Sequence, residues 1–262
     1  MFTKTLRDHW HGIVGWGAGL ALMALIELLV YPSVRDEAEG FRDLFEAYPE
    51  AMKAFMGVQE DFTSGPGFLA TELFGFLLPL VLLSVGISFG SGATAGEEER
   101  RTADLLMANP LTRTRVVLEK AAAMVVALVL VGAGLAIVLW VGVAALDMGV
   151  GWTRILAAVG GGVLLGALYG AVALLVGCLT GHRWLAAGVS TALALGAYLL
   201  SSLAPLVDAL QPWRGLSPFH WYAGAEQLTD GARLGGLGLL TVCALAVTWL
   251  AVLAFDRRDI GT

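Results

Sequence analysis

The acidic and histidine side chains are the first candidates for chemistry, and their spacing argues against a catalytic metal site. Glutamates occupy positions 97–99 in a row, which could suggest an intramembrane metalloprotease, since carboxylates bind metals and activate water. The HExxH pattern of that class is absent from the sequence. The four histidines, His9, His11, His182 and His220, are scattered over both expected sides of the membrane. We therefore expect no metal catalysis.

Nucleophile and phosphate-binding patterns are missing as well. Ser91 lies between two glycines and Ser190 follows Gly188-Val189, but neither serine belongs to a GxSxG turn. The GxxxxGK[ST] loop that cradles phosphates does not occur. The sequence thus predicts no catalytic residue, no cofactor and no ATP site in this chain.

Residues 96–120 suggest a different function, because they form a charged segment between two long apolar runs. Thr102 is suited to cap a short helix, and Asp104 falls in its first turn, where the helix dipole stabilises a carboxylate. Asn109-Pro110 would end this helix. Its apolar side chains are Leu105, Leu106 and Met107. An exposed apolar trio favours a docking surface, although a solvated connecting loop remains the alternative.

The basic residues predict on which side of a membrane this segment lies. Short loops rich in lysine and arginine stay in the cytoplasm. Of the 16 basic residues, ten fall on the side of this segment and six on the other, although the outer loops are longer. Both termini are therefore expected in the cytoplasm. The segment itself carries Arg100, Arg101, Arg113, Arg115 and Lys120.

Composition assigns most of the chain to lipid. Of 262 residues, 57% are hydrophobic and 15% are charged, whereas soluble domains have about a quarter charged residues. The mean hydropathy is +0.76. We expect an all-α integral membrane protein in which residues 1–262 form one transmembrane domain of six helices, each long enough to cross an apolar core of about 30 Å. The expected spans are residues 13–31, 68–95, 116–146, 154–180, 184–204 and 234–255.

Two spans and one loop carry more specific patterns. Gly162, Gly166 and Gly170 recur every fourth residue and predict close packing against another helix. Pro79 predicts a kink in the second span. The outer loop, residues 32–67, has eight acidic and three basic residues, and apolar residues at helical spacing predict two short amphipathic helices in it.

Glu27 and Glu72 lie near the outer ends of the first two spans. An ionisable group within a span normally faces a bundle interior or water, because a charge in lipid costs a few kcal/mol or more. We expect the two carboxylates to line an outer vestibule or exit gate that favours cationic amphiphiles. The alternative is that they reach the headgroup layer and have no special role.

The order of features in the charged segment resembles the permease family of type-2 ABC exporters. A glycine and glutamates end a span, an acidic helix with two leucines follows, and then come Asn109-Pro110, a Thr-Arg pair and Glu119-Lys120 at the start of the next span. The chain has Arg101-Thr102 where the family usually has Gly-Thr, which keeps the helix cap. The resemblance implies six spans, short re-entrant helices between the last two spans, and permeases that work in pairs.

The resemblance further implies the permease subunit of an ATP-driven exporter in a prokaryotic plasma (inner) membrane. Its partners would be membrane lipid, a second copy of itself and two copies of an ATP-binding subunit that holds ATP and magnesium, with no nucleic acid. The coupling segment would be residues 96–115, with its helix at 102–109. A membrane scaffold or intramembrane enzyme whose cytoplasmic loop recruits a soluble protein is the alternative, disfavoured by the lack of paired catalytic groups. The expected ATPase-coupling residues are Glu97, Glu98, Glu99, Arg100, Arg101, Thr102, Asp104, Leu105, Leu106, Met107, Pro110, Arg113, His182 and Arg183.

Overall fold

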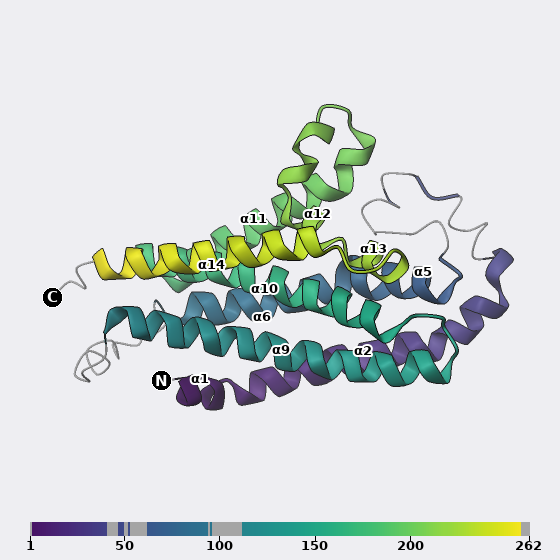
Figure 1. Cartoon of the computed structure of the whole chain (residues 1–262), viewed down its shortest axis with the longest axis horizontal. Coiled ribbons are helices and arrows are strands. Elements are labelled where there is room, and N and C mark those ends of the chain that lie inside the picture. The colour runs from purple at the N-terminus through teal and green to yellow at the C-terminus, as the bar shows by residue number, and fades with distance from the viewer. Residues whose placement is uncertain are drawn as a thin grey trace.

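The chain folds as a bundle of long helices, as the computed structural model shows (Figure 1). The structure describes residues 2–40, 47–49, 52, 62–93, 95 and 112–257, and no strand occurs among them. Six helical runs in this part are long and apolar enough to cross a membrane, which confirms the predicted fold class. They are α2 (Trp10–Asp36), the run α5–η1–α6 (Gly65–Leu69, Ala70–Leu77 and Leu78–Ala93), α9 (Arg113–Ala145), α10 (Trp152–Thr180), α11 (Arg183–Leu203) and α14 (Leu234–Arg257).

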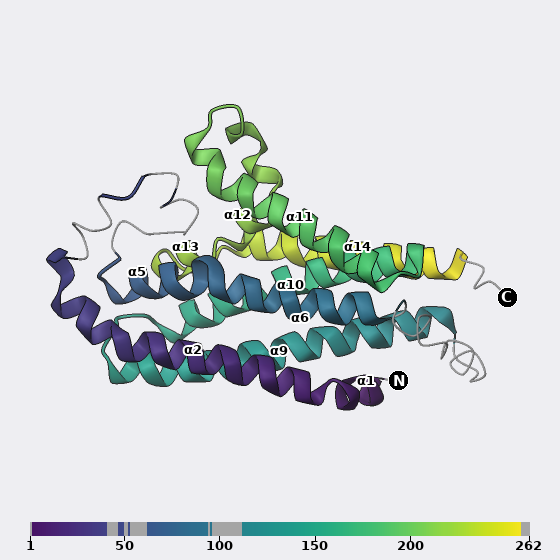
Figure 2. The same cartoon turned by 180° about the vertical axis from the view of Figure 1, so that it is seen from behind.

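Helix α10 lies at the centre of the bundle and packs against α6, α9, α11 and α14. Helices α2 and α9 lie side by side along one edge, and α11 and α14 lie on the opposite side (Figures 1 and 2). At one end, α11 diverges from the bundle. The most deeply buried large apolar side chains therefore come from the run α5–η1–α6, from α9 and from α10.

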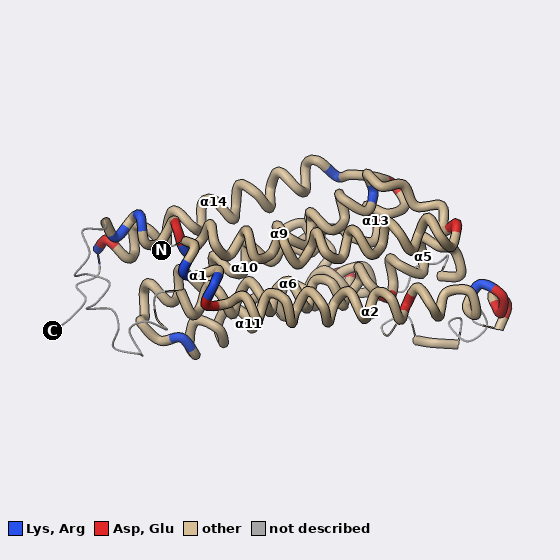
Figure 3. The backbone as a smooth tube through the Cα atoms, turned by 90° about the horizontal axis from the view of Figure 1, so that it is seen from below, with Lys and Arg blue, Asp and Glu red and all other residues tan. Residues whose placement is uncertain are grey.

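Charged residues gather at the two ends of the bundle and leave its middle almost uncharged (Figure 3). The short helix α1 (Phe2–Asp8) lies at the same end as the last turn of α14. This end, which we call the inner end, also holds the end of α6 and the start of α9, the residues that flank 94–111. An uncharged middle between charged ends is the pattern expected of a membrane-spanning bundle.

The first long helix continues past the point where residues 13–31 were expected to end. Pro32 lies inside α2, which runs on to Asp36. Proline removes one backbone donor but has a φ angle compatible with a helix, so a proline near the helix end costs few hydrogen bonds. The first turn of the expected outer loop is consequently helical, whereas the two predicted amphipathic helices fall mostly outside the described residues.

The second span is not a uniform α-helix. Eight residues before Pro79 form a π-helix, η1, which ends where the backbone N–H of Leu78 bonds to the carbonyl oxygen of Leu73, five residues back. Pro79 has no N–H to continue either pattern. The irregularity predicted for this proline is thus spread over the two preceding turns, and π-helical turns often accompany functional sites.

The glycine ladder of α10 packs against a matching pair of glycines in α6. A Cβ atom on Gly86 would lie 2.2 Å from the carbonyl oxygen of Gly166, and one on Gly90 would lie 2.0 Å from that of Gly170. The two backbones are therefore in direct contact, which only glycine permits. The structure confirms the close packing predicted from the ladder and identifies α6 as its partner.

The segment between α11 and α14 folds into four short helices, part of which projects from the bundle beyond the end of α11 (Figure 1). Ser217 fixes this segment, since its hydroxyl donates to the carbonyl oxygen of Ala197 at 2.7 Å and accepts from the N–H of Phe219. The predicted re-entrant position of these helices in a membrane stays a prediction. They are η2 (Ala204–Leu206), η3 (Gln211–Leu216), α12 (Pro218–Tyr222) and α13 (Gly224–Thr229).

Candidate functional site

Most of the expected coupling residues, Glu97 to Pro110, lie outside the described residues, but both flanks of that segment are described. After the segment, the hydroxyl of Thr112 caps α9 by accepting a hydrogen bond from the N–H of Arg115. The guanidinium of Arg113 donates to the carbonyl oxygens of Phe255 and Asp256, at 3.4 and 3.5 Å. The start of α9 is therefore attached to the end of α14.

The end of α6, which precedes the charged segment, is held by a buried lysine. Lys120, only 5% exposed, donates from Nζ to the carbonyl oxygen of Ala93, the last residue of α6. The last carbonyl groups of a helix have no partner within the helix, and a cation there also complements the helix dipole. Lys120 thus connects the end of α6 to α9, so that both flanks of the charged segment are attached to the same helix.

The turn between α10 and α11 lies at the same end. Gly181 ends α10 with φ of +69°, a left-handed conformation favourable to glycine. His182 precedes α11 and its Nδ1 lies 2.7 Å from the carbonyl oxygen of Thr180. Arg183 is the first residue of α11, and its guanidinium lies about 4 Å from the Cβ position of Gly92 in α6. Arg183 was expected to contact an ATPase, and its side chain points toward α6.

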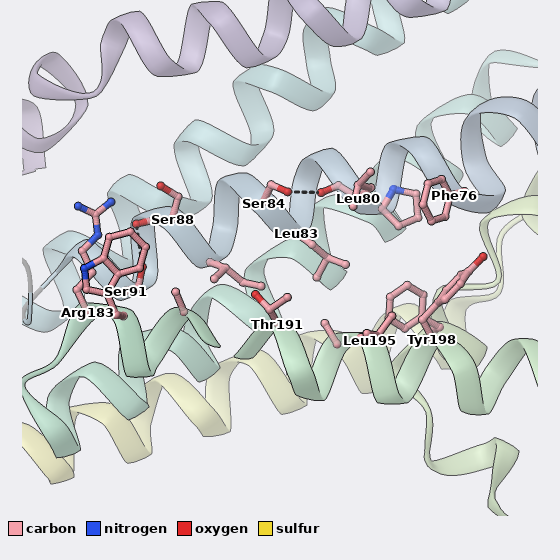
Figure 4. Close-up of a pocket in the computed structure, with 16 residues that line it drawn as sticks. Phe76, Leu80, Leu83, Ser84, Ser88, Ser91, Arg183, Thr191, Leu195 and Tyr198 are labelled. Carbon is pink, nitrogen blue, oxygen red and sulfur yellow. Dashed lines mark hydrogen bonds between the residues drawn. The ribbon is translucent and has the colours of Figure 1, made fainter. Parts of the chain in front are cut away.

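A groove of about 460 Å³ runs between α6 and α11 (Figure 4). Arg183 and Trp184 lie at its inner end, and Phe76, Tyr198 and Phe219 lie at the other end, which we call the outer end. The walls between them are mainly leucine, isoleucine and alanine. Such a volume falls within the roughly 300–1,000 Å³ of ligand pockets. The groove is therefore large enough for a drug-sized or lipid-like molecule.

Hydroxyl groups interrupt the apolar walls of this groove. Ser84, Ser88 and Ser91 lie on one face of α6, and Thr191 faces them from α11 (Figure 4). The hydroxyl of Ser84 donates to the carbonyl oxygen of Leu80 at 2.7 Å, and the hydroxyl of Ser91 donates to the carbonyl oxygen of Ser88 at 3.3 Å. Ser91 was considered from the sequence only as a nucleophile, and Ser84, Ser88 and Thr191 were not identified, although the spacing of the three serines is a signal that they share a helix face.

Aromatic side chains narrow the outer end of the groove. The ring of Tyr198 lies 5.3 Å from that of Phe219 and 6.0 Å from that of Phe76, measured between centroids. Tyr222 is buried beside them and donates its hydroxyl to the carbonyl oxygen of Phe74 at 3.0 Å, which satisfies a backbone acceptor within the π-helix. The aromatic contacts therefore join three elements, η1, α11 and α12, at this end.

The structure brings Glu27 and Glu72 together. Glu27 comes from α2 and Glu72 from the π-helix, and their carboxylates are close enough to interact electrostatically. Both side chains are partly buried, and neither lines the groove. Glu72 precedes Phe76 by one turn, so the pair lies beyond the outer end of the groove.

Comparison of the sequence with known protein families agrees with this architecture. The model of the family described as ABC-2 family transporter protein matches residues 2–260. No curated protein matches the chain.

Within the part of the chain that the structure describes, no group of three or more histidine, cysteine, aspartate or glutamate side chains could hold a metal ion.

Proposed function

Since the chain belongs to the ABC-2 family of transporter proteins and is a multi-pass permease subunit, we propose that it is the membrane half of an ATP-driven exporter. Two copies would form the transport path between them, driven by two copies of an ATP-binding subunit that holds ATP and magnesium. We place this assembly in a prokaryotic plasma membrane, with the inner end of the bundle in the cytoplasm. The groove between α6 and α11 is the single observation that supports this path most directly.

The groove suits a path between two copies because one side of it is open. Helix α11 buries little of its surface in the bundle, and its apolar side chains, such as Leu193 and Leu195, are both 55% exposed. Leu195 lines the groove. A second copy would supply the missing wall, and the hydroxyls of Ser84, Ser88 and Thr191 would then lie inside an enclosed path.

The attachments at the inner end support coupling through residues 96–115. A push on this segment would reach α6 through Lys120 and Ala93, and α14 through Arg113. Helix α6 forms one wall of the groove, so movement of its inner end would change the width of the path. We further propose that Glu27 and Glu72 line an outer vestibule, since they lie beyond the aromatic end of the groove.

Disulfide crosslinking tests the placement of the path. In a variant without Cys178 and Cys243, Leu195→Cys is expected to form a disulfide-linked dimer in membranes, since Leu195 would face its counterpart. Leu29→Cys is the matched control, because Leu29 is 78% exposed but lies on α2, on the other side of the bundle. Equal crosslinking of the two variants, or none at Leu195, would contradict a path at this groove.

Coupling is tested at the leucines of the expected helix. Burying one leucine contributes roughly 1.5–3 kcal/mol, whereas an exposed ion pair contributes about 0–1 kcal/mol. Leu105→Asp with Leu106→Asp should therefore release the ATP-binding subunit, measured by copurification, or abolish transport-linked hydrolysis. A single Glu98→Gln change is the control and should have a mild effect that grows at low salt. Normal insertion, copurification and transport by the double aspartate variant would refute the coupling proposal.

A further inference from the structure

The groove between α6 and α11 has an uneven distribution of charge. Among the described residues that line it, Arg183 is the only one with a charged side chain, and it lies at the inner end. The nearest acidic residue along α6 and its π-helical extension is Glu72, beyond the outer end. A molecule in the groove would therefore meet a positive charge at one end and apolar walls over the remaining length.

The backbone adds to the positive character of this end. Arg183 begins α11, a helix of 21 residues, and the preceding His182 makes no side-chain capping bond to it. The first N–H groups of a helix have no partner within the helix, and they carry the positive end of its dipole. The guanidinium contributes five N–H donors in a planar fork, so it can bind an anion while it keeps other contacts.

The apolar side chains that line the groove indicate which kind of group should be attached to that anion. Leu80, Leu83 and Ile87 line α6, and Ala187 and Leu195 line the facing side of α11. From Phe76 to Ser91 the groove follows 15 residues of helix, which is about 22 Å at 1.5 Å per residue. One leaflet of a bilayer core is about 15 Å thick. The groove is therefore long enough for the hydrocarbon chain of a lipid that enters from the inner leaflet.

Trp184 fits the depth that this arrangement requires. Its side chain is 82% exposed beside Arg183, and tryptophan is enriched where the apolar core meets the headgroups. Arg183 would thus lie at headgroup level of the inner leaflet, while the chain of the lipid extends toward Tyr198 and Phe219.

From these observations we propose that the groove binds an anionic, lipid-like amphiphile, with its acidic headgroup on Arg183 and the start of α11 and its hydrocarbon chain between α6 and α11. This inference rests on the proposed transport path and specifies its substrate class. The site lies at the inner end of the proposed path, where a molecule to be exported would enter, whereas the carboxylates of Glu27 and Glu72 lie beyond the outer end.

Photolabelling of the purified full-length protein in phosphatidylcholine nanodiscs, without any ATP-binding subunit, tests the site. The probe is hexadecyl phosphate with a diazirine at the middle of the chain, and the matched neutral probe is the corresponding hexadecanol. Labelled residues are identified by mass spectrometry. We expect labelling concentrated on the groove faces of α6 and α11, and at least five-fold weaker labelling by the neutral probe.

Variants separate this site from lipid that merely surrounds the protein. Arg183→Gln and Ile87→Trp, which fills the groove, should each reduce labelling at least five-fold, whereas Arg183→Lys should retain most of it. Arg257→Gln is the matched control, since Arg257 also lies at the inner end beside an apolar groove, lined by Leu179, Leu250 and Leu253. It should leave labelling of α6 and α11 unchanged.

Two results would overturn the proposal: labelling spread evenly over the lipid-facing helices, or labelling of α6 and α11 that is the same in Arg183→Gln as in Arg257→Gln. Elution volume in size-exclusion chromatography verifies that each variant is folded. Because the measurement needs neither ATP nor a partner, its failure would leave the exporter proposal standing. Conversely, failure of the crosslinking and coupling tests would leave a lipid-binding groove without a transport role.

Discussion

The contact between α6 and α10 is sensitive to a single added methyl group. A Cβ atom at Gly90 would lie 2.0 Å from the carbonyl oxygen of Gly170, 2.9 Å from its carbonyl carbon and 3.1 Å from the Cβ of Ala173. A carbon and a carbonyl oxygen approach to about 3.3 Å, so Gly90→Ala requires the two helices to separate by about 1.3 Å. Neither neighbour can move away easily, since the obstacle is backbone.

The cost of this separation follows from the packing it disrupts. Overpacking of a close-packed interior costs about 1–3 kcal/mol, and 1 kcal/mol shifts the Tm of a chain of this size by about 2–4 °C. We therefore expect Gly90→Ala to lower the Tm by about 2–12 °C. The measurement is thermal denaturation of the purified protein in detergent, followed by loss of the monodisperse peak in size-exclusion chromatography.

The control for Gly90→Ala is Gly134→Ala in α9. A Cβ at Gly134 meets nothing within 4 Å, and alanine is favoured over glycine inside a helix by about 1 kcal/mol. The control should therefore be neutral or stabilising. Equal Tm values for the two variants would show that α6 and α10 adapt to the added methyl group without cost, and would contradict a contact limited by backbone atoms.

Three further predictions concern the inner and outer ends. Tyr222→Phe should lower stability by about 1–3 kcal/mol, because it leaves the buried carbonyl oxygen of Phe74 without its donor; an unchanged Tm in the same assay would contradict this. Lys120→Met should lower the free energy of unfolding by about 1.5–3 kcal/mol, because the charged hydrogen bond to the carbonyl oxygen of Ala93 is lost. It should also reduce transport-linked ATP hydrolysis, and Lys120→Arg should partly restore it. Wild-type hydrolysis in the Met variant would argue against transmission through this contact. Glu27→Gln with Glu72→Gln should raise the Tm, because two like charges no longer repel one another, and should alter the export rate of charged amphiphiles; unchanged export of every substrate tested would reject the vestibule.

The six long helices could be predicted because hydropathy alone specifies them. Their ends were less accurate, as Pro32 shows, because a proline near the end of a helix removes few hydrogen bonds and leaves the helix free to continue. The π-helix before Pro79 was also unforeseen, since it depends on hydrogen-bond register and on the hydroxyl of Tyr222, a residue 148 positions from Phe74.

The candidate site was predicted only in part, for a similar reason. The glycine ladder of α10 predicts a close neighbour but does not identify it, because α2 carries glycines at the same spacing as α6, at Gly15 and Gly19. Arg183 was expected to contact an ATP-binding subunit, whereas its position beside Gly92 depends on how α11 lies against α6. The groove exists because α11 diverges from the bundle, and no local sequence pattern encodes that angle.

The glycine contact between α6 and α10 also bears on how a movement could pass along the second span. The two backbones are close from Leu82 to Gly90, since a Cβ on Gly166 would lie 2.8 Å from the carbonyl oxygen of Leu82 and one on Gly90 would lie 2.0 Å from that of Gly170. These eight residue steps cover about 12 Å at 1.5 Å per residue. A contact of that length hinders tilting of α6 against α10 more than a shift along it. A displacement at Ala93 would therefore reach the groove as a translation of similar size.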